Sequence, residues 1–224
     1  MEKLYGKKYV AFFDLDHTIL SVSSGAMLGK YLAEKKLLTL KHKFHFALAV
    51  ILSKAHLITQ HQAMSLVVKL WKNIPTANTV KSDDIFFQEY ILGNIREDAR
   101  KEINFHLSKN AAVIMLSASV TPVCIRVANY LGFDDVLCSE LEIVNDIYTG
   151  SLVGRYCHGK QKTVRAKLWC ETNSFSLKDA WYYGDDYEDR FILAAVGNPR
   201  CVTPRGKLKE FAARKNWEVL NWQR

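Results

Sequence analysis

The stretch VAFFDLDHTIL, residues 10–20, decides the fold, because an apolar run leads straight into two carboxylates. The run Tyr9–Phe13 is typical of a buried strand in a parallel sheet. Asp14 and Asp16 follow at the carboxyl end of this strand, and Thr18 adds a hydroxyl. Open α/β sheets bind their ligands at that edge. Two acids this close repel each other, which predicts a metal cation or a shifted pKa; the alternative is a loop whose aspartates cap backbone amides.

Three later segments carry chemistry that fits the first. The segment YYGDDYED, residues 182–189, is a second apolar strand that runs into acids, with Asp185 and Asp189 four residues apart. The segment IMLS, residues 114–117, is a third strand, which ends in the hydroxyl of Ser117. The segment CHGKQK, residues 157–162, places Lys162 near the start of an amphipathic helix. One such motif indicates little, whereas four in this order favour a single active site.

Taken in order, these four motifs resemble those of the haloacid dehalogenase superfamily of phosphatases. The segments LSAS (116–119), ELE (140–142), YTG (148–150) and VGNP (196–199) are similar to its phosphoserine-phosphatase-like subfamily. The resemblance covers the chain apart from roughly residues 21–90. It implies an α/β fold with a Rossmann-like parallel sheet core and an inserted α-helical cap domain. The implied core comprises residues 1–20 and 91–224, and the implied cap comprises residues 21–90.

Phosphoryl transfer needs an in-line nucleophile, a proton donor for the leaving oxygen and positive charge around the equatorial oxygens. Asp14 is the candidate nucleophile, since a carboxylate can carry a phosphoryl group as an acyl phosphate. Asp16 would protonate the leaving alkoxide and then deprotonate the attacking water. Lys162 and Ser117 would hold the phosphoryl oxygens, and Thr18 is a further candidate for substrate binding.

Two neighbours could take over roles in this assignment. Lys160 lies two residues before Lys162, and Ser119 lies two residues after Ser117. The family pattern Cys-x-Gly-x-x-Lys favours Lys162, and the expected position at the end of a strand favours Ser117.

The resemblance also implies a Mg²⁺ site, in keeping with the preference of this ion for oxygen ligands. Asp14 and Asp185 would supply carboxylates, and Asp16 would supply its backbone carbonyl. Asp189 would orient the lysine or a metal-bound water, and it completes the predicted metal set. Asp186 departs from the family pattern, in which Ser or Asn is more usual; we expect it to cap the following helix.

Composition indicates an ordinary globular protein. The 224 residues suit one large or two small domains, and 49% hydrophobic with 24% charged residues is usual for soluble chains. The five cysteines are scattered without a Cys-x-x-Cys pair, which favours reduced thiols over disulfides or zinc. No secretory signal precedes the first strand, so we expect a cytoplasmic protein.

The net charge of +8 is unevenly distributed. Between Ser21 and Ser82 the chain has nine lysines and one acid, Glu34. This pattern is typical of a solvated lysine face, and it would also suit steering of anionic substrates or contact with anionic lipid. Nucleic acid is not expected as a partner, because no arginine precedes Arg96. The apolar stretch Phe44–Leu52 is too short to span a membrane; it indicates a buried helix or a peripheral membrane contact.

Periodicity gives the expected order of elements. Three helical segments at 25–36, 39–54 and 59–72 form the insertion, with a capping box at Thr59 and Gln62, an end at Pro75 and another helix opening at residues 82–84. This insertion would act as a lid over the active edge. The expected later elements are a helix at 95–108, a strand at 111–116, a helix at 122–131 ended by Gly132, a hairpin at 141–152 with its turn at 145–146, a helix at 160–170, a strand at 180–183, a short helix through 193 and a helix at 206–215.

The sequence thus predicts a Mg²⁺-dependent phosphomonoester hydrolase that works through an aspartyl-phosphate intermediate. A phosphotransferase could use the same site, and a catalytically idle basic module that binds membranes or nucleic acid is the rival from another class. Phosphoserine is disfavoured as substrate, because its carboxylate and ammonium call for an arginine fork and an acid in the cap. We expect a small-molecule phosphomonoester instead, larger or lipid-like and anionic; no feature of the sequence indicates an oligomeric state.

Overall fold

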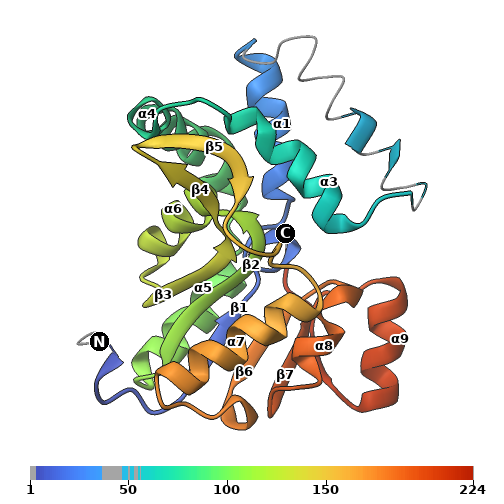
Figure 1. The fold of residues 1–224 in the computed structure, drawn as a ribbon. Coiled ribbons are helices and arrows are strands. Elements are labelled where there is room, and N and C mark those ends of the chain that lie inside the picture. Colours follow the sequence, from blue (N-terminus) through green and yellow to red (C-terminus); the bar gives the residue numbers. More distant parts are fainter. Residues whose placement is uncertain (1–3, 37–46, 50, 53–54, 56, 224) are drawn as a thin grey trace.

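The computed structural model describes residues 4–36, 47–49, 51–52, 55 and 57–223, and a parallel sheet forms the centre of this part of the chain (Figure 1). Its strand order is β3-β2-β1-β6-β7-β8, so the first strand lies in the interior between β2 and β6. The α/β fold with a Rossmann-like parallel sheet is therefore confirmed. The strands are β1 (Val10–Phe13), β2 (Ala112–Val120), β3 (Asp135–Ser139), β6 (Trp181–Gly184), β7 (Asn198–Val202) and β8 (Glu218–Leu220).

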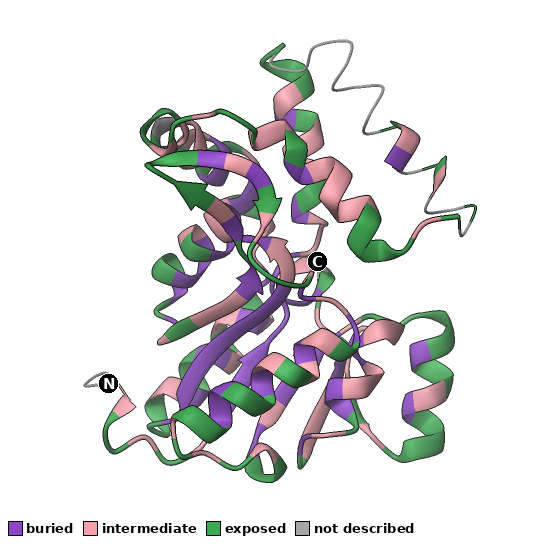
Figure 2. Cartoon of the chain, viewed as in Figure 1, coloured by how far each residue is buried: buried purple, intermediate pink, exposed green. Residues whose placement is uncertain are grey.

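The sheet is covered on both faces, which explains why β1 is apolar at every position. Successive strand side chains point to opposite faces, so Ala11 and Phe13 join one core while Val10 and Phe12 join the other. The buried strands run through the middle of the molecule in Figure 2. The first core also contains residues of α5 (Glu97–Ser108) and α6 (Thr121–Leu131), and the second contains residues of α7 (Lys160–Thr172), α8 (Arg190–Leu193) and α9 (Gly206–Lys215).

Several predicted boundaries agree with the structure. The helix α6 ends where expected, at Gly132 in the left-handed conformation, and α9 spans the expected residues 206–215. The strands β3, β7 and β8 were not predicted. The strand β2 runs to Val120 rather than ending at residue 116, although its regular pairing with β3 breaks after Leu116. Ser117 therefore lies where the ladder becomes irregular, not at the end of the strand.

The described part of the segment between β1 and α5 is mainly helical. Its elements are α1 (Ser24–Glu34), α3 (Gln60–Val67), the 3₁₀ turn η3 (Val68–Trp71), α4 (Thr76–Phe86), the π turn η4 (Phe87–Ile91) and the 3₁₀ turn η5 (Leu92–Asn94). The capping box of Thr59 and Gln62 is present at the start of α3. Of the helix expected at 39–54, and of the apolar stretch within it, residues 47–49 and 51–52 are described and are helical; the others lie outside the described residues.

The prediction that a helix begins at residues 82–84 is wrong about the first residue of that helix. The helix α4 begins at Thr76, directly after Pro75, and Ser82 lies inside it. Pro75 therefore precedes a helix rather than closing one. The reason is a tertiary contact, because Pro75 forms a bridge with Ile147 and the amide of Thr76 donates to the carbonyl of Asp146 at 2.8 Å, which fixes the chain just before the first helical turn.

The partner of that contact is the predicted hairpin, which consists of β4 (Leu141–Val144) and β5 (Ile147–Leu152). Its turn residues Asn145 and Asp146 both have positive φ, as a two-residue hairpin turn requires. Backbone hydrogen bonds join Tyr148 of β5 to Asn73 and Ile74. The hairpin thus fastens the helical insertion to the rest of the chain.

The division into residues 1–20 with 91–224 and residues 21–90 stays a prediction. Among the described residues, no helix is long and apolar enough to cross a membrane.

Candidate active site

The chain turns sharply after β1, and this turn presents Asp14 at the sheet edge. Residues Leu15–Ile19 form a π-type turn in which His17 has a φ of 56°. The amide of Asp14 donates to the carbonyl of Tyr183 in β6 at 2.9 Å, so the residue still belongs to the parallel ladder. Its Oδ1 accepts from the amide of Leu15 at 2.7 Å, which orients the carboxylate. Because β1 lies between β2 and β6, the residues after those strands meet Asp14 at one edge.

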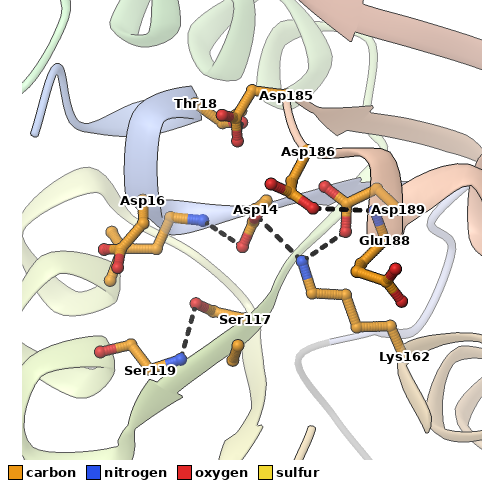
Figure 3. Close-up of polar contacts among 12 residues, drawn as sticks. Asp14, Asp16, Thr18, Ser117, Ser119, Lys162, Asp185, Asp186, Glu188 and Asp189 are labelled. Carbon is orange, nitrogen blue, oxygen red and sulfur yellow. Dashed lines mark hydrogen bonds and ion pairs between the residues drawn. The ribbon is translucent and has the colours of Figure 1, made fainter. Parts of the chain in front are cut away.

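A buried lysine contacts Asp14 directly (Figure 3). The Nζ of Lys162 lies 2.9 Å from Oδ2 of Asp14 and 2.7 Å from Oδ1 of Asp189, and it donates to the hydroxyl of Tyr182 at 3.0 Å. Lys162 is only 3% exposed. Burial by itself lowers its pKa, but the charges of Asp14 and Asp189 outweigh this effect and raise the pKa well above the ordinary value. The lysine is therefore held as a cation beside the candidate nucleophile.

Three carboxylates converge on the same point. One oxygen each from Asp14, Asp185 and Asp189 lies within 4.8 Å of the others. Burial and mutual repulsion raise the pKa of Asp14 to about 7, against the lowering effect of the lysine, and the pKa of Asp185 to about 8. The Oδ2 of Asp189 is buried without a hydrogen-bond partner. A side chain at Gly184 would place its Cβ 2.5 Å from that oxygen, so the glycine leaves room for it.

Asp16 points away from the carboxylate cluster. Its Oδ1 accepts from the amide of Ser24 at 2.9 Å, and its Oδ2 accepts from the hydroxyl of Ser23 at 3.3 Å. Figure 3 shows Asp16 and Lys162 on opposite sides of Asp14. Burial raises the pKa of Asp16, while the hydrogen bonds from Ser24 lower it. The effect of burial is the larger one, so the pKa of this carboxyl group, which lies at the start of α1, is raised. Its carboxylate is not part of the cluster, and the predicted role of its backbone carbonyl as a metal ligand stays a prediction.

The predicted hydroxyls take different positions. Thr18 is buried and its hydroxyl donates to Oδ1 of Asp185 at 3.3 Å, so it holds a carboxylate of the cluster. Ser117 is buried and its hydroxyl oxygen accepts from the amide of Ser119 at 3.1 Å, which leaves its hydrogen available to a ligand. The hydroxyl of Ser119 is instead 2.8 Å from that of Ser24. This geometry favours Ser117 over Ser119 as the residue that donates a hydrogen bond to a phosphate oxygen.

The remaining candidates lie outside the cluster. Lys160 is exposed, and its Nζ lies 5.3 Å from the centre of the Phe191 ring, so the geometry favours Lys162. Asp186 accepts from the amide of Glu188 at 2.8 Å and caps the following turn, as expected. His17 is exposed.

Sequence reasoning missed three residues that contact the predicted ones. Ser23 and Ser24 bind Asp16, and the pair of serines before a helical segment is a typical helix start that could have indicated a donor. Tyr182 binds Lys162, and the signal was a tyrosine inside a fully buried strand, because a buried phenol needs a hydrogen-bond partner.

Comparison with known proteins agrees with the fold and the motifs. The sequence model of the haloacid dehalogenase-like hydrolase family matches residues 11–193, and the chain belongs to this family. The predicted family, and with it the prediction of an enzyme, is thereby confirmed.

Among the relatives, phosphoserine phosphatase SerB1 from Mycobacterium tuberculosis (strain ATCC 25618 / H37Rv) is 26% identical over 219 residues, which cover 95% of this chain and 70% of that protein. A histidinol-phosphatase from Neisseria meningitidis serogroup C (strain 8013) is 24% identical and covers 96% of this chain and 100% of its own length. A crystal structure of a protein with unknown function from Bordetella pertussis Tohama I superposes with a TM-score of 0.90 at 22% identity; the match covers 96% of this chain and 99% of that one.

Proposed function

We propose that the protein is a Mg²⁺-dependent phosphomonoester hydrolase that forms an aspartyl-phosphate on Asp14. The observation that carries this proposal is the arrangement around that side chain. Lys162 contacts Asp14 on one side and Asp16 lies on the other, while two further carboxylates complete an oxygen-rich cluster. The relatives named as phosphatases support the same chemistry.

The residues at the site fit a divalent cation. All three converging side chains offer oxygen, which is the donor that Mg²⁺ prefers. The orphaned Oδ2 of Asp189 and the raised pKa values of Asp14 and Asp185 indicate carboxylates that lack a sufficient counter-charge. When bound, the ion would neutralise these acids and draw charge from the phosphoryl oxygens.

Each side chain then has a defined role in the proposed reaction. The Oδ of Asp14 that faces the phosphate attacks phosphorus, and the bond to the leaving oxygen breaks as the new acyl phosphate bond forms. Asp16 gives its proton to that leaving oxygen and later takes a proton from the water that hydrolyses the acyl phosphate. Lys162 and the hydroxyl of Ser117 stabilise the negative charge on the equatorial oxygens. The raised pKa of Asp16 supports its role as the proton donor.

The substrate is proposed to be a phosphomonoester larger than phosphoserine, anionic at its phosphate and apolar elsewhere. The two relatives reported above are named for different substrates, so they do not single out either one. Glu34, the one acid between Ser21 and Ser82, has its carboxylate occupied by the hydroxyl of Tyr90 and lies near Lys30 on the surface. It is therefore not displayed toward a substrate ammonium. The first arginine, Arg96, donates to the carbonyls of Trp222 and Gln223.

We infer a cytoplasmic location from the cysteines, all five of which are free thiols and buried. The proposed peripheral membrane contact depends on Phe44–Leu52, much of which lies outside the described residues. It is a separate proposal from the reaction.

Release of inorganic phosphate from a panel of phosphomonoesters tests the function. The panel contains phosphoserine, histidinol phosphate, a sugar phosphate and a lipid phosphate, each with EDTA and with added Mg²⁺. We expect turnover that EDTA abolishes and Mg²⁺ restores, with phosphoserine among the weaker substrates. No phosphate release under any condition would contradict the hydrolase, and the idle basic module would take its place. Transfer to an added alcohol in preference to water would favour the phosphotransferase.

A further inference from the structure

An apolar cavity of about 280 Å³ lies between the helical insertion and the start of α6. This volume is near the lower end of the range of about 300–1,000 Å³ that ligand pockets occupy. Its walls come from α1, η3, α4 and the first turn of α6, which are brought together from distant parts of the sequence. The main apolar lining residues are Leu28, Tyr31, Leu32, Trp71, Phe86 and Val123.

The cavity adjoins the side of the site where Asp16 lies. The amide of Ser24 binds the Asp16 carboxylate, and Leu28 follows Ser24 by one helical turn, about 6 Å along α1. The hydroxyl of Ser24 also contacts Ser119 near the end of β2, and Val123 follows Ser119 by four residues, in the first turn of α6. Two independent walls of the cavity therefore begin at residues around the proposed proton donor.

We propose that this cavity receives the apolar part of the leaving alcohol, so that the preferred substrate is a phosphomonoester with a hydrocarbon body of several carbons. The inference rests on the proposed function, in which Asp16 protonates the leaving oxygen. An alcohol oxygen at Asp16 would have its carbon chain on the side away from Lys162, which lies across Asp14 from Asp16 (Figure 3). The helix α1 begins at the serines that bind Asp16. The alcohol then passes along Leu28 into the cavity. Burial of each methylene group there contributes to binding.

One polar group limits what the far part of the alcohol can carry. Asp83 is the one charged side chain among the described residues that line the cavity. Burial raises its pKa to about 6, so it remains mostly ionised above pH 7. The hydroxyl of Thr79 and the charges of Arg126 and Asp84 also act on Asp83. The negative charge of Asp83 would repel a carboxylate or second phosphate in the cavity, whereas a hydroxyl group could donate to it. The cavity therefore selects against anionic ends.

The first experiment measures kcat/KM for ethyl, butyl, hexyl and octyl phosphate with Mg²⁺ present. We expect a rise of about fourfold per added methylene until the cavity is full. The variant Leu28→Trp, which places a larger side chain in the cavity wall one turn from Ser24, should flatten this dependence while circular dichroism shows retained helix content. Inhibition by free octan-1-ol and not by ethanol is expected as a second measurement. A kcat/KM that is independent of chain length in the wild type would overturn the inference.

The second experiment compares hexyl phosphates that end in a methyl, hydroxyl or carboxylate group. The wild type should discriminate against the carboxylate by at least tenfold, and Asp83→Asn should remove most of this discrimination. The matched control is Asp179→Asn, since Asp179 is exposed in the 3₁₀ turn Leu177–Asp179 and does not line the cavity, so this variant should leave the ratio unchanged. Equal discrimination in both variants would overturn the role of Asp83. Absence of phosphate release from every ester would overturn the proposed function itself, which is a different result from release that ignores the alcohol.

Discussion

Replacing Lys162 by methionine should destabilise the protein in a manner that depends on pH, and the size of the effect follows from the site. Removing the ammonium leaves the carboxylates of Asp14 and Asp189 buried with one positive charge missing. The protein can restore the balance by taking up one proton. At pH 7, protonating a carboxyl whose pKa in the unfolded chain is about 3.9 costs about 4 kcal/mol, since each pH unit is worth about 1.36 kcal/mol. This value agrees with the loss of about 3–5 kcal/mol seen when one partner of a buried ion pair is removed.

The same reasoning gives the sign of the pH dependence. As pH falls, the free-energy cost of binding the compensating proton decreases, so the destabilisation by Lys162→Met should shrink to about 1.5 kcal/mol at pH 5. Urea unfolding of the wild type and the variant at both pH values measures this difference. A loss that is equal or larger at pH 5 would refute the view that Lys162 acts as the counter-charge of this cluster.

The matched control is Lys160→Met, because Lys160 is exposed and lies against Phe191 without an ion pair in the described structure. Its effect on stability should stay within about 0.5 kcal/mol. Activity should follow the same order, with kcat/KM about 10²–10³ lower for Lys162→Met and little changed for Lys160→Met. The opposite ranking in a phosphate-release assay would move the catalytic role to Lys160.

Four further predictions test other parts of the molecule. Asp14→Asn should abolish phosphate release with the fold intact by circular dichroism, and more than a few per cent of residual activity would exclude the covalent intermediate. Apparent Mg²⁺ affinity, measured by calorimetric titration, should weaken from pH 8 to pH 6 as protons bind Asp185 and Asp14, whose pKa values are raised to about 8 and about 7; constant affinity would contradict this competition. Burial lowers the pKa of His106 to about 4, so below pH 6.5 the unfolded chain binds a proton on this imidazole that the folded chain does not bind. Between pH 7.5 and 4.5 the free energy of unfolding of the wild type should therefore fall by about 2–3 kcal/mol more than that of His106→Gln. Gly197→Ala should impair folding, because its Cβ would lie 1.8 Å from a backbone carbonyl, whereas Gly29→Ala in α1 meets no atom within 4 Å and should raise the thermal midpoint slightly.

The residues at the carboxyl ends of strands could be placed from the sequence because a parallel sheet brings these ends to one edge. Asp14 follows β1, Ser117 lies where β2 loses its regular pairing, and Asp185 follows β6. The strand order β2-β1-β6 places these three strands side by side, so the predicted residues lie at one edge without any knowledge of side-chain packing. The choice of lysine needed a family pattern, since neither Lys160 nor Lys162 is marked by local chemistry.

Elements whose existence depends on tertiary contacts were missed. The strand β7 reads Asn-Pro-Arg-Cys-Val at residues 198–202, which has neither alternation nor a continuous apolar run, and it pairs because β6 and β8 lie on either side of it. The start of α4 was misplaced because Ser82 and two acids after it form a typical helix opening, whereas the actual start follows Pro75, which is held by the hairpin. Local sequence gives no signal for a contact with residues 70 positions away.

The first residues of the insertion couple substrate choice to the reaction. Ser24 belongs to α1, yet its amide binds the proposed proton donor and its hydroxyl contacts Ser119 on β2. A displacement of α1 would therefore alter both the hydrogen bonds that lower the pKa of Asp16 and the wall of the cavity that Leu28 forms. The chemistry of Asp14 and Lys162 depends on the sheet, whereas the acceptance of an alcohol depends on α1. Since Ser24 contacts both the proposed proton donor and the helix that lines the cavity, an alcohol that fits poorly against α1 should lower kcat as well as raise KM.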